Sequence, residues 1–136
     1  MRQNFINQKY SVVFDGYTER HFIKDFERKY QNSWEVTKLS ITESLERIYN
    51  LSGTKLIDVI CISNCDTFLT KFDFKVANTK ESAKTSGNRC ILDVCNKSLK
   101  IRVLLVYGKM HIDRSEHQET LWWKEKIMEN FCLCCS

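Results

Sequence analysis

The segment that decides the fold of this chain is Thr67-Phe68-Leu69-Thr70-Lys71-Phe72-Asp73-Phe74-Lys75-Val76. Its phenylalanines all fall at even-numbered positions, whereas its charged residues all fall at odd-numbered ones. Residues two apart on a β-strand point to the same face, so this alternation predicts a strand with one apolar and one charged face. We expect helices to cover the apolar face, and we expect the charged face to remain open to solvent as a concave basic surface.

The flanking sequence predicts four more strands around this one. β-Branched and aromatic residues followed by turn residues indicate strands at residues 9–14, 55–62, 88–95 and 100–107. Short turns join the last four strands of the chain, and short turns favour antiparallel pairing.

Apolar residues at helical spacing predict three helices. The first follows Thr18 as N-cap, and the second extends from about residue 34 to 49, after a short break that makes an αα-hairpin. The last covers about residues 118–131. The residues expected to face the core are Phe22, Ile23, Phe26 and Tyr30, then Leu39, Thr42, Leu45, Ile48 and Tyr49, then Leu121, Trp122, Lys124 (by its aliphatic stem), Ile127 and Met128. The predicted fold class is therefore α+β, with an N-terminal αα-hairpin packed on a curled, mainly antiparallel β-sheet and a C-terminal helix.

Length and composition favour one domain. The chain has 136 residues and no proline, which predicts a single domain over residues 1–131 and a disordered cysteine-rich tail over residues 132–136. Because we find neither an apolar signal core nor a membrane-spanning run, we expect a soluble, cytoplasmic protein with no membrane partner. The seven cysteines are odd in number, so neither a disulfide framework nor a zinc finger is indicated. We expect no metal site and no cofactor, with Cys61 and Cys90 as small core residues.

Positive charge is concentrated in one part of the chain. The net charge is +4, but residues 67–111 contain nine basic and three acidic residues. A local excess of positive charge is typical of a surface that binds a phosphate-rich partner, although a solvated strand face has the same composition.

Three segments are candidates for the surface that carries this charge. They are Lys71 to Lys75 in the central strand, Thr85-Ser86-Gly87-Asn88-Arg89 before the next strand, and Tyr107-Gly108-Lys109-Met110-His111 at the end of the last strand. We expect all three to converge on the charged face of the sheet.

These segments resemble the RelE/ParE superfamily of type II toxins, and most of all its HigB- and RelE-like branch. The resemblance covers about residues 10–111, and its most specific parts are Ser86-Gly87-Asn88-Arg89 and Leu104-Leu105-Val106-Tyr107-Gly108-Lys109. It implies a ribosome-associated mRNA endonuclease that is held inactive by a co-encoded antitoxin. Many RelE-like proteins have an arginine where this chain has Met110, so protonation of the leaving group would fall to His111 or Arg114.

The candidate residues suit RNA cleavage without a metal, which needs a deprotonated 2′-hydroxyl, a stabilised phosphorane and a protonated leaving oxygen. Arg89 is the candidate clamp for the transition state, because its guanidinium matches phosphate oxygens. Lys75 and Lys109 would position the backbone, and a lysine of lowered pKa could be the base. His111 is the candidate acid or base, and Tyr107 would stack on a base or lend its hydroxyl. The candidate RNA contacts are Lys71, Lys80, Lys84, Arg102 and Arg114.

Each of these interpretations has a structural alternative. Arg89 could pair with Asp73 or Asp93, Tyr107 could be a core-edge aromatic residue, and His111 could have no chemical role. The adjacent Trp122 and Trp123 suggest a contact surface for an antitoxin, unless core packing accounts for them. At the level of function, the alternatives are a non-catalytic ParE-like inhibitor of DNA gyrase and an inactive RNA-binding relic on the same scaffold.

Overall fold

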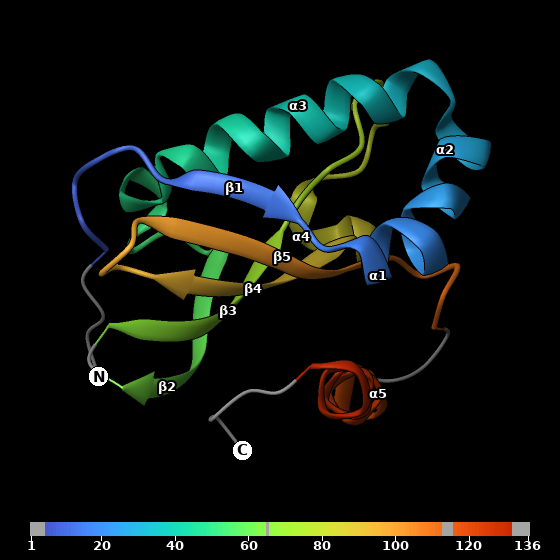
Figure 1. The fold of residues 1–136 in the computed structure, drawn as a ribbon. Helices are drawn as coiled ribbons and strands as arrows, with labels where there is room; N and C mark the ends of the chain where they lie inside the picture. The colour runs from blue at the N-terminus through green and yellow to red at the C-terminus, as the bar shows by residue number, and fades with distance from the viewer. Residues whose placement is uncertain (1–4, 65, 113–115, 132–136) are drawn as a thin grey trace.

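The computed structural model describes residues 5–64, 66–112 and 116–131, and the described chain is built around a five-stranded sheet (Figure 1). The strands are β1 (Ser11–Phe14), β2 (Ile57–Asn64), β3 (Thr67–Asp73), β4 (Arg89–Cys95) and β5 (Lys100–Tyr107). Their order in the sheet is β1-β5-β4-β3-β2, with β1 parallel to β5 and all other pairs antiparallel. The predicted α+β class and the mainly antiparallel sheet are confirmed.

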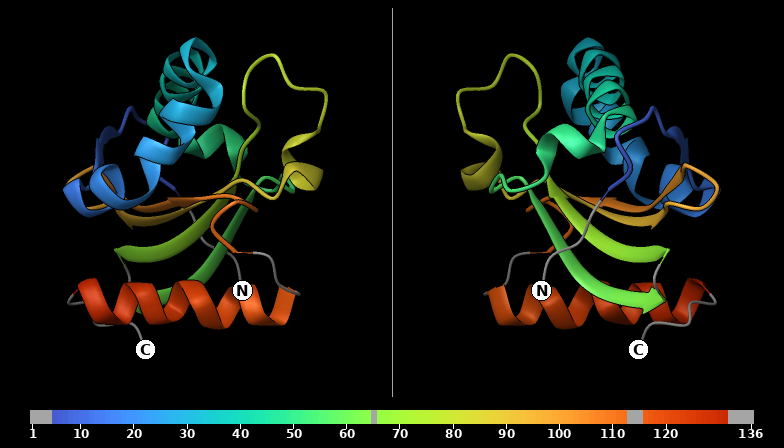
Figure 2. Two further views of the ribbon diagram at one scale, coloured as in Figure 1. Left: turned by 90° about the vertical axis from the view of Figure 1, so that its right-hand side faces the viewer. Right: turned by 90° about the vertical axis from the view of Figure 1, so that its left-hand side faces the viewer.

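Helices cover both faces of the sheet. After β1 the chain forms α1 (Gly16–Thr18), a π-helical turn η1 (Glu19–Ile23) and α2 (Lys24–Tyr30), then reverses into α3 (Asn32–Glu46) and the 3₁₀ turn η2 (Ile48–Leu51). The remaining helices are α4 (Ala83–Ser86) and α5 (Glu116–Asn130). Figure 2 shows three layers, with α3 above the sheet and α5 below it. None of the helices in the described part of the chain combines the length and the apolar character needed to cross a bilayer.

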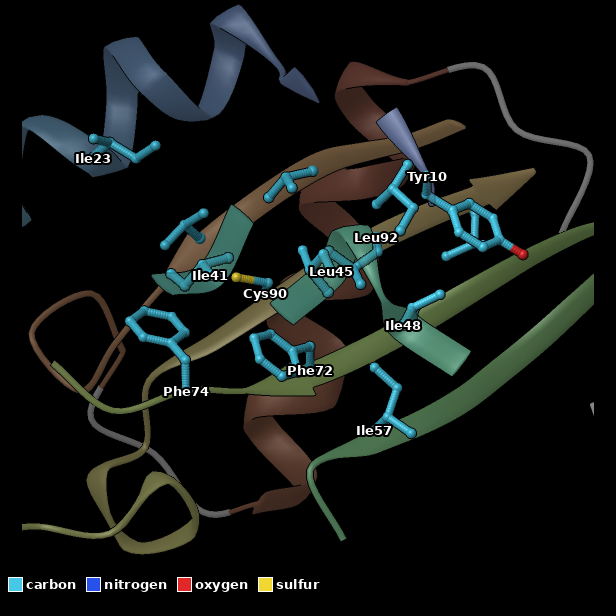
Figure 3. Packing of buried hydrophobic residues seen from close by; sticks show 14 of the residues in the cluster. Tyr10, Ile23, Ile41, Leu45, Ile48, Ile57, Phe72, Phe74, Cys90 and Leu92 are labelled. Atoms are coloured by element: carbon cyan, nitrogen blue, oxygen red, sulfur yellow. The ribbon is translucent and has the colours of Figure 1, made fainter. Parts of the chain in front are cut away.

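The main core lies between the sheet and the αα-hairpin, as the even-numbered apolar positions predict. Phe72 and Phe74 from β3 and the segment after it meet Ile41 and Leu45 from α3 in this layer (Figure 3). Burial of such side chains contributes about 1.5–3 kcal/mol each. This contact therefore fixes which face of β3 the hairpin covers.

The opposite face of the sheet is not open, so the expectation of an exposed concave basic surface is wrong. Helix α5 covers it, and Trp123 and Ile127 are only 3% and 4% exposed there. The physical reason lies on β4 and β5. Their residues on this face include Ile91 and Leu105, which are fully buried and need an apolar partner.

The helix stripes differ from the predicted ones at several positions. Asp15, rather than Thr18, caps the first helix, because its carboxylate accepts the Tyr17 N–H at 2.9 Å. Thr18 is buried instead, and its hydroxyl accepts the Val106 N–H from β5 at 2.8 Å. In α3, Leu39 is exposed, whereas Trp34, Thr37, Ile41 and Leu45 are buried.

The C-terminal helix is also rotated relative to the prediction. Leu121, Lys124 and Met128 face solvent, while Trp123 and Ile127 pack on the sheet. Trp122 is half-buried against Phe22 and Tyr107. Core packing therefore accounts for Trp123, whereas Trp122 is only partly covered by its contacts within the molecule.

Two predicted core cysteines have different environments. Cys90 is fully buried, as predicted. Cys61 is half-buried on β2 and is disulfide-bonded, which the sequence did not indicate.

Candidate functional site

Arg89 begins β4 and lies between two neighbours in the sheet. The register places it opposite Asp73 of β3 and opposite Tyr107 of β5. Directly paired residues point to the same face, so these three side chains share the α5 face, and Lys71, two residues before Asp73, shares it as well. The arrangement brings Arg89 to the same face as Lys71, which a cationic site requires.

Two carboxylates hold the guanidinium of Arg89. Its Nε lies 3.1 Å from Oδ1 of Asp73, and its Nη1 donates to Oε2 of Glu119 on α5. The Arg89 side chain is 15% exposed and that of Asp73 only 3%. Both carboxylates raise the pKa of Arg89 against the opposing effect of burial, which is the largest single influence. Of the two alternative pairings, the one with Asp73 is present, whereas Asp93 lies opposite Arg102.

The same carboxylate of Glu119 also binds Tyr107. The Tyr107 hydroxyl donates to Oε2 at 2.7 Å, and the Trp122 ring packs edge-on at 5.1 Å between centroids. Tyr107 is fully buried, and burial raises the pKa of its phenol well above the ordinary value, reinforced by the bond to Glu119. The phenol is therefore neutral at physiological pH, and its ring has no exposed face on which a base could stack.

A second cation reaches this group from α4. The Lys84 ammonium lies 3.1 Å from the other oxygen of Asp73, and 58% of the Lys84 side chain is exposed. Asp73 therefore bridges one buried and one accessible cation. A buried charge is tolerated only when it is paired in this way.

These groups border a pocket of about 210 Å³. Its lining consists of Lys84, Thr85, Gly87, Arg89, Lys109, Ile112 and Glu119. Lys109 extends along the rim, where its ammonium donates to the Thr85 carbonyl at 3.1 Å and lies 3.9 Å from Glu81. The pocket thus gathers three of the predicted cations, from α4, from the start of β4 and from the segment after β5.

Two glycines allow these segments to approach each other. Gly87 ends α4 in the left-handed conformation with φ of 76°, and a Cβ on it would lie 2.9 Å from the stem of Lys109. A Cβ on Gly108 would lie 2.4 Å from Oδ1 of Asn88. The two glycine-containing motifs therefore pack on one another, and this contact sets Lys109 beside Arg89.

His111 lies outside this pocket. Its Nδ1 accepts the Gly108 N–H at 3.1 Å, so the proton is on Nε2, which lies 3.0 Å from Asp25 of α2. The ring packs against Phe22 and Phe26, and burial lowers the pKa of His111, opposed by Asp25. This neutral imidazole links α2 to the end of β5.

The remaining predicted RNA contacts and the catalytic candidate Lys75 are dispersed. Lys71 is half-buried opposite Asp58 of β2. Lys75 and Lys80 are exposed, and Lys75 borders a different pocket, of about 310 Å³, between α3 and the segment after β3. Arg102 lies 3.8 Å from Asp15 and over the ring of Phe131. Arg114 is outside the described residues.

Sequence reasoning missed Glu119, the residue that connects α5 to the site. One signal was present, because Glu119, Trp123 and Ile127 are spaced four residues apart and so share one helix face. The prediction placed Trp122 rather than Trp123 in the core, and the helix face chosen in this way did not include Glu119.

The described side chains include no group of three or more His, Cys, Asp or Glu residues placed to hold a metal ion. Comparisons with protein-family models, with curated proteins and with solved structures found no match to this chain.

Proposed function

We propose that this protein is the toxin of a type II toxin–antitoxin system, an mRNA endonuclease that cleaves by attack of the 2′-hydroxyl without a metal. The observation that carries the proposal is the pocket in which Lys84, Arg89 and Lys109 meet. Two of its walls are the glycine-containing motifs that carry the resemblance to RelE- and HigB-like toxins. The proposed partners are mRNA, on the ribosome, and a co-encoded antitoxin in the cytoplasm.

The pocket would bind one phosphate of the RNA backbone. Lys84 and Lys109 stand at its rim with most of their side chains exposed, so they would meet the phosphate first as point charges. Arg89 lies deeper and offers the planar fork that a phosphorane requires. Cleavage at the 2′-hydroxyl would make the enzyme specific for RNA and would leave a cyclic phosphate.

A specific observation favours the second candidate, a non-catalytic ParE-like inhibitor of DNA gyrase. Neither Tyr107 nor His111 is available for proton transfer in the described arrangement, since one is fully buried and the other is bonded through both ring nitrogens. Among the residues that line the pocket, none has an ordinary pKa near neutrality. A phosphate-binding surface without an acid or a base would inhibit rather than cleave.

A cleavage assay with a matched pair of lysine variants tests the proposal. The purified protein is incubated with a single-stranded mRNA, with and without ribosomes, and the product ends are identified by mass spectrometry. We expect a 2′,3′-cyclic phosphate end, and no cleavage where the scissile nucleotide is 2′-deoxy. Lys109→Met should reduce the cleavage rate by about 10²-fold, typical of losing one preorganised charge. Lys97→Met removes the same charge from the exposed turn between β4 and β5 and should leave the rate unchanged.

The alternatives give different results in the same preparation. Inhibition of gyrase supercoiling without RNA cleavage would favour the second candidate. RNA binding that is lost in Lys109→Met, with no cleavage and no gyrase inhibition, would identify an inactive relic.

A further inference from the structure

The carboxylate of Glu119 occupies the position in which an anion would contact Arg89. It accepts hydrogen bonds from the Arg89 guanidinium and from the Tyr107 hydroxyl, both at Oε2. Carboxylate and phosphate oxygens bind a guanidinium in the same way, through charge-assisted hydrogen bonds. A phosphate that reached Arg89 would therefore compete with Glu119 for the same donors.

The charges around the pocket are balanced in this arrangement. Lys84, Arg89 and Lys109 face the carboxylates of Asp73 and Glu119, and Glu81 lies 3.9 Å from the Lys109 ammonium. Three cations and three anions leave the group with no excess positive charge to attract a phosphate. Without the charge of Glu119 the group would have one excess positive charge, in a partly buried site where screening is weak.

Asp73 and Glu119 have different relations to Arg89. Asp73 belongs to β3, is fixed by the sheet register and is nearly fully buried. Glu119 belongs to α5, which is a separate layer, and its side chain is 16% exposed at the pocket. Of the two anions, Glu119 is the one that rotation of a side chain or movement of a helix would remove.

We propose that the pocket at Arg89 is an oxyanion-binding site whose anion position is filled by Glu119, so that α5 blocks phosphate binding in this arrangement. The ligand class is a phosphate group, free or in a nucleic-acid backbone. The proposal rests on the proposed function for its assignment of Arg89 to phosphate binding, and it adds that α5 must release Glu119 before Arg89 can act.

Titration with inorganic phosphate at low ionic strength tests this inference on the full chain. We expect Glu119→Gln to bind phosphate at least tenfold more tightly than the unaltered protein, by isothermal titration calorimetry. Glu125→Gln is the matched control, because it removes the same charge from an exposed position of the same helix. It should bind like the unaltered protein. Adding Arg89→Met to Glu119→Gln should abolish the gain.

A second variant keeps the inference testable if Glu119→Gln does not fold. Tyr107→Phe keeps the buried ring and Arg89 but removes one of the two donors that hold Glu119, and we expect about threefold tighter phosphate binding. Thermal unfolding monitored by circular dichroism verifies that each variant is folded. Equal phosphate affinity in folded Glu119→Gln and the unaltered protein, or an equal gain in Glu125→Gln, would overturn the inference.

Phosphate binding is measured without RNA, so the inference and the proposed function can fail separately. Tighter phosphate binding by Glu119→Gln without any RNA cleavage would support the blocked oxyanion site and count against the endonuclease. Cleavage by the unaltered protein that Glu119→Gln loses, with no gain in phosphate affinity, would overturn the inference and identify Glu119 as a group that the reaction needs.

Discussion

Replacing Arg89 by methionine should destabilise the protein strongly, irrespective of any role in catalysis. Methionine fills a similar volume but leaves Asp73, which is almost completely buried, and Glu119 without the cation between them. Removing one partner of a buried ion pair costs about 3–5 kcal/mol. Lys84 remains 3.1 Å from Asp73 and compensates part of the loss. We therefore expect the free energy of unfolding to fall by about 3 kcal/mol, the lower end of that range.

Urea denaturation followed by tryptophan fluorescence measures this change. A double-mutant cycle then separates the ion pair from the loss of packing. Asp73→Asn removes the unpaired charge, so the Arg89→Met/Asp73→Asn protein should be more stable than the sum of the two single changes by about 1–3 kcal/mol.

Arg102→Met is the matched control for this cycle. Arg102 is 46% exposed and lies 3.8 Å from Asp15, so its removal should cost less than about 1 kcal/mol. A loss below 1 kcal/mol in Arg89→Met, or strictly additive single changes, would refute the reasoning that the buried carboxylates depend on Arg89. The prediction also bears on toxicity assays, because loss of growth arrest in an Arg89 variant has to be separated from loss of the fold.

Three further predictions concern other parts of the molecule. Burial lowers the pKa of His111, so the unfolded chain takes up a proton near pH 6.5 that the folded protein excludes. Stability should therefore fall as the pH drops from 7.5 to 5.5, by at most about 1.4 kcal/mol per pH unit, and urea titrations of His111→Gln should lack this contribution. Gly108→Ala should cost about 1–3 kcal/mol in the same assay, because its Cβ would lie 2.4 Å from Oδ1 of the buried Asn88; an unchanged midpoint would contradict the packing of the two motifs. Of the two free cysteines described, Cys95 should react with iodoacetamide faster than Cys90, as measured by peptide mass spectrometry. Hydrogen bonds from Ser98 lower the pKa of Cys95, whereas burial raises the pKa of Cys90. Faster modification of Cys90 would contradict this order.

The strands and the order of elements could be predicted from the sequence because their signals are local. Alternating residues in Thr67–Asp73 define the two faces of β3, and the turns after β2 and β4 make the antiparallel pairs the simplest arrangement. Helix phase was less reliable. In α3 and α5 adjacent apolar residues allow more than one stripe, and Leu39 and Leu121 fit a stripe that the folded protein leaves exposed.

The candidate site could be predicted only in part. The grouping of Arg89 with Lys109 followed from two glycine-containing motifs, and the structure brings both residues to one pocket. The place of His111 did not follow, because its partner Asp25 lies 86 residues away in the chain and only the position of α2 brings the two together.

By itself, the sequence determined that this chain forms an α+β domain with a two-faced central strand and a basic segment on it. Only the tertiary structure decided that α5 covers the charged face and that Asp73 and Glu119 neutralise Arg89. The physical reason is the range of the interactions. Side-chain alternation is set by the backbone over a few residues. What covers a face of the sheet, and which charges meet there, depends instead on apolar surface and ion pairs from distant parts of the chain. Asp73 and Glu119, for example, lie 16 and 30 residues from Arg89 in the sequence.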